Sequence, residues 1–385
     1  MTLQKLLQIE AELRKAYFER DEEVHGSIVA LLARQHVLLL GPPGTAKSQL
    51  VEDLCARIGG NYFSWLLTKF STPEELFGPI SLKSLEQDKY TRIITGKLPE
   101  AHIAFIDEVW KGSSSILNTL LRIVNERKFD NNGAPVKVPL LSLFGASNEL
   151  PESGELSALY DRFLLRFMTQ YIASPQNFVN MLASQPSLSN TVITMQELTA
   201  MQTETEKVAL PDDVYIALVN LREVLKKENI IASDRRYKQA LSLIKANAYL
   251  GGRTKATPDD LAILQHVLWS QPSEYKMVRK LVLNTVNPVL SKIQELLDVA
   301  KEVYHQAMDP NAQKDKEAGN KIGFEATVKL RRIQEDLGKL ASTPDTAKVL
   351  DDARTKVKAY SDEIYNVIMG ITNDRRKVNW SECFR

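Results

Sequence analysis

The sequence HVLLLGPPGTAKSQL, residues 36–50, decides the fold of this chain. Residues 36–40 predict a short buried strand, and residues 49–58 return to helical spacing. The turn between them has a glycine, four residues, a position normally held by glycine, and then Lys-Ser. A strand, a glycine-bearing loop and a helix in this order predict a phosphate-binding loop. The residues expected to bind the nucleotide are Gly41, Pro42, Pro43, Gly44, Thr45, Ala46, Lys47, Ser48 and Gln49.

The chemistry of this loop comes from its main chain and from two side chains. Backbone N–H groups and the positive end of the following helix bind phosphate oxygens. Lys47 adds a positive charge near the β- and γ-phosphates, and the Ser48 hydroxyl is a ligand for Mg²⁺. Ala46 replaces the second glycine and is expected to take right-handed helical dihedrals, because the loop enters its helix there. The alternative is an ordinary strand-to-helix turn.

A pair of carboxylates follows a second apolar run. Residues 103–106 predict a buried strand, which ends in Asp107 and Glu108. Asp107 is placed to hold Mg²⁺ through water, and Glu108 to orient or deprotonate the attacking water. Many strands end in solvated acidic residues, so the pair is informative only together with the phosphate loop. The two features predict an ATPase that uses ATP and Mg²⁺.

Two further positions are candidates for the same reaction. Asn148 ends a strand, where its amide would orient the water from the side opposite Glu108, or would merely form a turn. Arg162 lies inside an apolar run. Its alternatives are a salt bridge to Asp161 or Glu155, and an arginine finger that enters a neighbouring subunit's site.

Other arginines compete for related roles. Arg166, expected one helical turn beyond Arg162, is the rival finger. Arg235 and Arg236 follow Ser-Asp at a predicted helix start, from which an arginine would reach back to the γ-phosphate. A solvated helix start is the alternative for both.

Composition and charge limit the remaining possibilities. The chain has 385 residues, more than one core usually organises, and a formal net charge of +1. No overall field draws it to nucleic acid or to an anionic membrane. Its two cysteines, Cys55 and Cys383, form neither a disulfide framework nor a zinc pattern, which favours a reducing, cytoplasmic compartment. The N-terminus has no signal-peptide pattern, and no apolar run is long enough for a membrane span.

The pattern of elements predicts three domains. Strands alternate with helices in residues 1–172, which predicts an α/β nucleotide-binding core around a parallel sheet. Within it, residues 128–140 hold Asn-Asn-Gly between strand-like flanks and predict a hairpin. Residues 173–272 predict an all-α lid. Residues 273–385 predict a helical C-terminal domain, in which the polar stretch 309–323 is expected to be a loop.

These motifs, in this order, resemble those of the AAA+ ATPases, and within them the MoxR family and its RavA-like branch. GPPGTAKS resembles the family's GPPGxAKS, and IAFIDE at residues 103–108 resembles Walker B. Asn148 corresponds to sensor 1, Arg162 to the arginine finger and Arg235 to the sensor 2 arginine. The RavA-like marks are TKFSTPEELFGP at residues 68–79, ASNELP at residues 146–151 and SDRR at residues 233–236.

The resemblance covers roughly residues 5–270 and implies a fold, a reaction and partners. It implies a ring, usually a hexamer, with ATP at the subunit interfaces, where Arg162 acts in trans and Arg235 in cis. It also implies a protein partner with a von Willebrand factor A domain, which the ATPase remodels or activates. Residues 73–98 and 128–140 would be the family's helix-2 insertion and pre-sensor-1 hairpin, facing the pore.

The C-terminal residues depart from the RavA-like pattern. RavA-like proteins carry a small β domain within a helical C-terminal region, whereas residues 273–385 look helical throughout. Any partner bound through that β domain is therefore not implied for this chain.

Two other functions fit the same residues. The first is a nucleic-acid motor, because related ring ATPases with the same insertions translocate DNA. The near-neutral charge and the lack of a basic, aromatic-rich module argue against it. The second is a scaffold in which ATP binding only assembles the ring. Stimulation of ATP turnover by DNA would favour the motor, and complementation of cells by Glu108→Gln would favour the scaffold.

Overall fold

The computed structural model describes residues 2–151, 154–184, 191–286, 288–309, 316–340 and 344–368. The chain forms two compact units, which divide between residues 279 and 280. Every residue that the sequence analysis assigned to a nucleotide site lies in the first unit. The further division of this unit at residue 172 stays a prediction.

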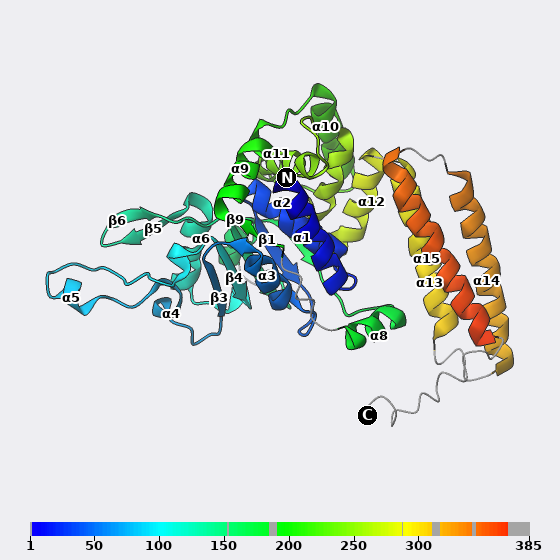
Figure 1. Ribbon diagram of the computed structural model, residues 1–385, viewed down its shortest axis with the longest axis horizontal. Coiled ribbons are helices and arrows are strands. Elements are labelled where there is room, and N and C mark those ends of the chain that lie inside the picture. The colour runs from blue at the N-terminus through cyan, green and yellow to red at the C-terminus, as the bar shows by residue number, and fades with distance from the viewer. Residues whose placement is uncertain are drawn as a thin grey trace. The chain divides into compact units, whose positions relative to one another are not determined.

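A five-stranded parallel sheet forms the centre of the first unit (Figure 1). Its order is β3-β4-β7-β1-β8, so β1 has a strand on each side. Every residue of β1 is buried, as is typical of parallel strands covered on both faces. The sheet confirms the predicted α/β class. The strands are β1 His36–Leu40, β3 Tyr62–Leu66, β4 Ile103–Asp107, β7 Ser142–Ser147 and β8 Phe163–Met168.

The strand β8 was not predicted from the sequence. It pairs in parallel with β1, from His36 opposite Phe163 to Leu40 opposite Met168. Arg166 therefore lies in a strand, and the prediction of helical spacing between it and Arg162 is wrong. The reason is that FLLRFM is a short apolar run, which periodicity does not distinguish from a buried helical segment.

Helices cover the sheet and connect its strands (Figure 1). The first helix, α1, packs on α2 and on α3, the helix that follows the phosphate loop. α2 also contacts β1 and β8, which brings the N-terminal segment close to the loop. These elements are α1 Thr2–Ala16, α2 Asp21–Ala33, α3 Lys47–Ala56, η1 Leu98–Glu100, η2 Val109–Lys111, α6 Ser114–Glu126 and α7 Gly154–Tyr160.

Two chain segments form one projection at a side of the sheet (Figure 1). The predicted hairpin is present, and its Asn131 side chain exchanges hydrogen bonds with the main chain of Arg92. The next residue, Asn132, exchanges hydrogen bonds with the main chain of Tyr90. Two asparagines of the hairpin thus hold it to the segment that contains Tyr90 and Arg92. The elements are α4 Pro73–Phe77, α5 Leu82–Leu85, β5 Lys128–Asn131 and β6 Ala134–Lys137.

The rest of the first unit is mostly helical, as predicted. α11 packs on α2, and a two-stranded parallel sheet joins β2 to β9. Trp269 is fully buried in the core. The elements are β2 Ile58–Gly59, α8 Pro175–Ala183, β9 Ile193–Thr194, α9 Met195–Lys207, α10 Asp212–Lys227, α11 Asp234–Leu250, η3 Pro258–His266, η4 Pro272–Glu274 and α12 Tyr275–Val286, which extends into the second unit.

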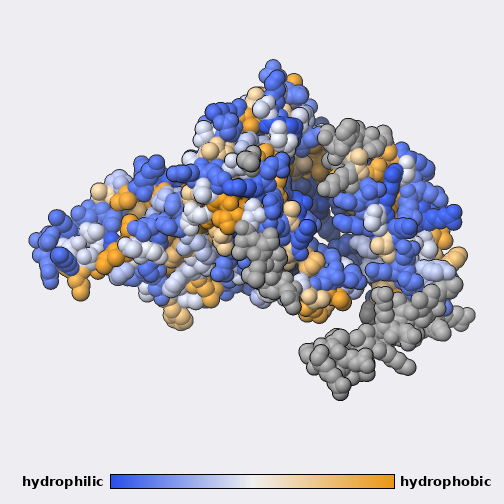
Figure 2. All heavy atoms as spheres, viewed as in Figure 1, coloured by the Kyte–Doolittle hydropathy of each residue, from blue (hydrophilic) through white to orange (hydrophobic). Residues whose placement is uncertain are grey.

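The helix α8 differs from its neighbours because none of its residues is buried. Its exposed apolar side chains include Phe178 and Leu182, and apolar surface is visible at this place in Figure 2. Glu19 accepts hydrogen bonds from the N–H groups of Ala173 and Ser174, so the start of α8 is anchored beside the loop between α1 and α2.

The described part of the second unit contains the end of α12 and three long helices, α13 Pro288–Met308, α14 Lys316–Lys339 and α15 Pro344–Ile368. Their shared apolar core includes Leu330 and Val357, both fully buried. The prediction of a loop over residues 309–323 is wrong for its second half, because α14 begins at Lys316 and Ile322 packs against this core. Residues 310–315 lie outside the described part of the chain.

Two sequence predictions concern the cysteines and the membrane. Cys55 is a free, buried cysteine of α3, and Cys383 lies outside the described residues. Within the described ranges, no helix has the length and apolar character needed to cross a bilayer.

Candidate functional site

The phosphate loop leaves the carboxyl end of β1 and is fixed at its first residue. Gly41 N donates a hydrogen bond to Ser147 O at 3.0 Å, so the loop begins beside the end of β7. A Cβ on Gly41, whose φ is +152°, would lie 2.1 Å from Thr169 O, and only glycine fits there. Gly44 has a φ of +75° with open space around it, so its dihedral alone favours glycine.

Ala46 takes a left-handed conformation, with φ at 61° and ψ at 26°. The prediction of right-handed dihedrals is therefore wrong. The reason is that α3 begins only at Lys47, which leaves Ala46 within the loop. A left-handed conformation costs a residue with a Cβ about 1–2 kcal/mol. Strain of this kind persists where the surrounding structure enforces it.

Arg20 hydrogen-bonds to the main chain of the phosphate loop and was not identified from the sequence. It is buried, and its Nε donates to Thr45 O at 3.4 Å while its Nη2 donates to Gln170 O. Thr45 itself donates from Oγ1 to Pro42 O at 3.0 Å. The loop thus rests on the N-terminal segment and on the residues that follow β8. No sequence motif surrounds Arg20.

The Lys47 side chain is folded over the loop. Its Nζ donates to Gly41 O at 2.7 Å and to Pro42 O at 2.8 Å. Burial lowers the pKa of Lys47, and the negative charges of Asp107 and Glu108 act in the opposite direction. The amine therefore lies within the field of both carboxylates. A phosphate bound in the loop would replace the carbonyl oxygens as its partner, because hydrogen bonds between charged groups are stronger.

The structure brings Glu108 and Asn148 together at the carboxyl ends of β4 and β7. Glu108 is left-handed, with φ at 52° and ψ at 46°, and its N–H donates to Asp107 Oδ1 at 3.0 Å. Asn148 Nδ2 donates to Glu108 Oε1 at 3.2 Å, so the two groups touch and do not face each other across a water. Lys111, which the sequence analysis did not select, lies 3.2 Å from Glu108 Oε2.

The candidate ligands for Mg²⁺ are the Ser48 hydroxyl and the Asp107 carboxylate. Ser48 and Gln49 are exposed on the first turn of α3, and Asp107 is half-buried at the end of β4. Among the described residues, no three His, Cys, Asp or Glu side chains converge on a metal site. A hydroxyl and one carboxylate fit Mg²⁺, which usually keeps several waters and takes its remaining ligands from substrate phosphates.

Arg162 lies at the opposite edge of the sheet. β1 and β8 are parallel with His36 opposite Phe163 at their amino ends, whereas the phosphate loop follows the carboxyl end of β1. Arg162, which directly precedes β8, donates from Nε to Asn125 Oδ1. Its Nη1 lies 3.4 Å from Asp161 Oδ2, which is one of the two salt bridges considered from the sequence.

Arg235 lies close to Arg162 and not at the phosphate loop. The pKa of Arg162 is lowered by burial and, second, by the positive charge of Arg235. The start of α11 is held at this edge because Arg236 Nη2 lies 3.3 Å from Asp161 Oδ1. The predicted reach of Arg235 to the γ-phosphate of its own site is therefore not supported. The side chain of Glu155, the other partner considered for Arg162, lies outside the described residues.

The rival arginines are buried. Arg166 is 1% exposed and Arg236 is 3% exposed, and both donate hydrogen bonds to main-chain carbonyls of the same chain. Neither guanidinium is presented to a ligand. Arg162 thus remains the finger candidate and Arg235 the sensor 2 candidate.

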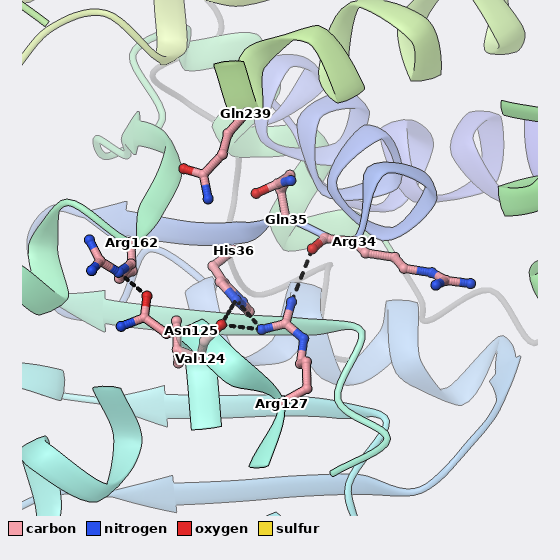
Figure 3. Close-up of a pocket in the computed structure, with 8 residues that line it drawn as sticks. All are labelled: Arg34, Gln35, His36, Val124, Asn125, Arg127, Arg162 and Gln239. Carbon is pink, nitrogen blue, oxygen red and sulfur yellow. Dashed lines mark hydrogen bonds between the residues drawn. The ribbon is translucent and has the colours of Figure 1, made fainter. Parts of the chain in front are cut away.

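A cavity of about 260 Å³ lies beside Arg162 (Figure 3). Arg127 and His36 also line it, and the guanidinium of Arg127 points toward the imidazole, with Nη1 2.7 Å from Nε2. Burial and the charge of Arg127 hold the pKa of His36 well below its ordinary value. The imidazole is therefore neutral, and the positive charge of this edge comes from arginines.

Comparisons with known proteins agree with this architecture. Residues 4–208 match a family described as the MoxR domain in the MoxR-vWA-beta-propeller ternary systems, and residues 213–282 match an AAA lid domain. The chain is 38% identical to an uncharacterised protein of Methanocaldococcus jannaschii, over 97% of this chain and 99% of that protein. It is 24% identical to the chaperone MoxR1 of Mycobacterium tuberculosis, over 54% of this chain and 55% of that protein.

One solved structure shows the same fold. It is a crystal structure from Cytophaga hutchinsonii, described as a candidate ATPase, with a TM-score of 0.60 and 16% identity. The match covers 74% of this chain and 95% of that chain. At this identity the likeness concerns the fold alone.

Proposed function

The chain belongs to the MoxR family of AAA+ ATPases, and on this premise we propose that it forms a ring that hydrolyses ATP to remodel or activate a protein partner. One observation carries the proposal of hydrolysis. The phosphate loop, two carboxylates and an amide from three neighbouring strand ends meet at the carboxyl edge of one parallel sheet. In such sheets, ligands bind outside the carboxyl ends of the strands. The residues are Lys47, Asp107, Glu108 and Asn148.

The proposed reaction assigns a role to each group. Loop N–H groups and Lys47 bind the phosphates, and Ser48 and Asp107 hold Mg²⁺, which supplies charge neutralisation when bound. Glu108 accepts a proton from water as the water oxygen bonds to the γ-phosphorus and the bond to the β–γ bridging oxygen breaks. Asn148 orients the Glu108 carboxylate, with which it is already in contact. Positioning and charge do most of the work in such a transfer.

We propose that Arg162 and Arg235 complete the site of a neighbouring subunit. Both lie at the amino edge of the sheet, away from the phosphate loop of their own chain. A head-to-tail ring places this edge against the carboxyl edge of the next subunit. Arg162 would leave Asn125 and Asp161 to reach the γ-phosphate there, as an arginine finger. The trans role of Arg235 replaces the cis role predicted from the sequence.

Exchange of the proposed base tests the assignment. Glu108→Gln should bind ATP like the wild type and reduce its turnover by about 100-fold or more, because proton transfer to a positioned base contributes that much. Turnover is measured as phosphate release, and binding with a fluorescent ATP analogue. The matched control is Glu149→Gln, which removes the charge of an exposed carboxylate next to Asn148 and should hydrolyse ATP at the wild-type rate. Wild-type turnover by Glu108→Gln would refute the role of Glu108.

The proposed partner contains a von Willebrand factor A domain, because the matched family is described by its MoxR-vWA-beta-propeller systems. The segments at residues 73–98 and 128–140 would be the helix-2 insertion and the pre-sensor-1 hairpin. Affinity purification of Glu108→Gln with ATP, in parallel with wild type and ADP, tests the partner. The proposal expects a von Willebrand A protein enriched only in the first sample, and its absence there would contradict it. The hexameric state, the RavA-like branch and the cytoplasmic location remain predictions.

A further inference from the structure

The two residues before Arg162 are tied to a segment of the lid. Tyr160 Oη donates a hydrogen bond to Ser270 O at 2.6 Å. The guanidinium carbon of Arg166 lies 3.7 Å from the centroid of the Tyr160 ring, and its Nη2 donates to Tyr160 O at 3.1 Å. The same guanidinium donates from Nη1 to Trp269 O at 2.6 Å. Arg166 thus connects the turn that carries the finger candidate to residues 267–270.

Arg236 makes a second connection of the same kind. Its Nη1 donates to Val267 O at 2.6 Å. Its Nη2 lies 3.3 Å from Asp161 Oδ1 and 3.4 Å from Asp161 O. Residue 161 directly precedes Arg162, so α11 and residues 267–270 both hold the finger turn. The two arginines act from different elements, β8 and α11, on one short segment.

Burying these two guanidinium groups is unfavourable in free energy, which points to a role beyond filling space. Burial lowers the pKa of Arg166 to about 9 and lowers that of Arg236 as well. Removing a charged group from water is unfavourable. The penalty is offset here by hydrogen bonds to carbonyls, by the Asp161 carboxylate and by the Tyr160 ring against Arg166. What these bonds secure is the geometry of residues 160–162.

We propose that Arg236 and Arg166 are positioning residues, which hold the turn bearing Arg162 onto residues 267–270 so that the finger moves with its own lid. This inference rests on the proposed action of Arg162 in the neighbouring site. Neither buried guanidinium touches the nucleotide. Their effect is on where Arg162 is presented, and therefore on the rate at the adjacent subunit.

The inference makes a specific kinetic prediction. Arg236→Ala should lower kcat by about 100-fold, the typical cost of misplacing a reacting group by about 1 Å. Its KM for ATP should stay near the wild-type value, because the phosphate loop of each subunit is unchanged. Arg236→Lys, which keeps a charge but loses the fork of donors, should recover part of kcat. Asp161→Asn changes a partly exposed side chain and should lower kcat in the same way with little effect on folding.

Rings assembled from two different variants distinguish a positioning role of Arg236 from a structural defect in the Arg236→Ala subunit. Arg236→Ala subunits keep an intact nucleotide site, and Glu108→Gln subunits keep an intact finger turn. When the two inactive variants are mixed in equal amounts, random assembly puts an intact finger beside half of the intact sites, so about a quarter of wild-type activity should return. Arg162→Ala mixed with Glu108→Gln is the reference, and Arg253→Ala, which loses a salt bridge to buried Asp260 within the lid, is the control for lid damage.

The outcomes distinguish this inference from the proposed function. Recovery with both Arg162→Ala and Arg236→Ala supports the inference. Recovery with Arg162→Ala alone overturns it and leaves the finger standing, whereas recovery with neither refutes the finger itself. If Arg236→Ala does not fold, as judged by circular dichroism, Asp161→Asn takes its place in the mixture. If Arg253→Ala is inactive alone and recovers to the same extent in the mixture, the inference is also overturned, because a general lid defect would then explain the recovery.

Discussion

Replacement of Ala46 by glycine should stabilise the protein, against the usual effect of glycine. Ala46 has a φ of 61° and a ψ of 26°. Its left-handed conformation costs about 1–2 kcal/mol, which glycine would not incur. Glycine loses about 0.5–1 kcal/mol more conformational entropy than alanine on folding. The middle of each range gives a difference of about 0.75 kcal/mol, by which Ala46→Gly should raise the free energy of unfolding.

A matched variant gives the opposite sign. Ala11 is exposed in the interior of α1, a right-handed helix, where Ala11→Gly should lower the free energy of unfolding by about 1 kcal/mol. Urea unfolding of wild type and both variants, followed by circular dichroism, measures the two changes. ATP affinity should persist in Ala46→Gly, since the loop keeps its N–H groups. If Ala46→Gly is destabilised as much as Ala11→Gly, Ala46 is not left-handed in the folded protein and the reasoning fails.

Three other substitutions test the loop and its surroundings. Burial raises the pKa of Glu23 from 4.5 to about 7. The folded state therefore holds a proton that the unfolded state releases, and stability falls as pH rises through that window. In urea unfolding at pH 8, Glu23→Gln should be more stable than wild type by up to about 3 kcal/mol, and at pH 4 it should show no such gain. A gain in stability that does not depend on pH would contradict the raised pKa of Glu23. The Cβ of Gly41→Ala would meet Thr169 O, so this variant should lose about 2 kcal/mol or more of its free energy of unfolding, and should also lose ATP binding. Gly44→Ala should lose only about 1 kcal/mol, because open space surrounds Gly44 and only its dihedral is strained. Equal losses in the two variants would count against the steric argument.

The sheet and its carboxyl edge could be predicted from the sequence because the signals there are local. Residues 36–40 are continuously apolar, and the loop that follows them has a chemical pattern. Asp107 and Asn148 both follow apolar runs, and parallel strands bring such ends to one edge. The pattern did not reveal that Glu108 and Asn148 touch, or that Lys111 joins them, because side-chain partners depend on tertiary geometry.

The amino edge was harder to predict because its contacts are distant in sequence. Arg236 meets Asp161 across 75 residues, and Arg166 meets Trp269 across 103 residues. In sequence, Arg166 and Arg236 each looked as suitable for catalysis as its neighbour, Arg162 or Arg235. Their burial in the structure distinguishes Arg166 and Arg236 from Arg162 and Arg235. Whether a single charged residue within an apolar run is buried cannot be predicted from one sequence. The same limit applies to Arg20, whose partners lie in the phosphate loop and after β8.

The length of one strand explains why a single chain does not complete the proposed site. β1 has five residues, which span about 16 Å at the usual rise of a strand. The phosphate loop begins at one end of this span, and Arg162 and Arg235 lie at the other. On the proposed assignment, each chain would carry two complementary half-sites that face in opposite directions along the sheet. Half-sites of this kind would meet through a head-to-tail contact, which forms a ring when its rotation closes and an open filament when it does not. If the proposed roles of Arg162 and Arg235 hold, ATP hydrolysis would therefore be a property of the assembly and not of the single chain.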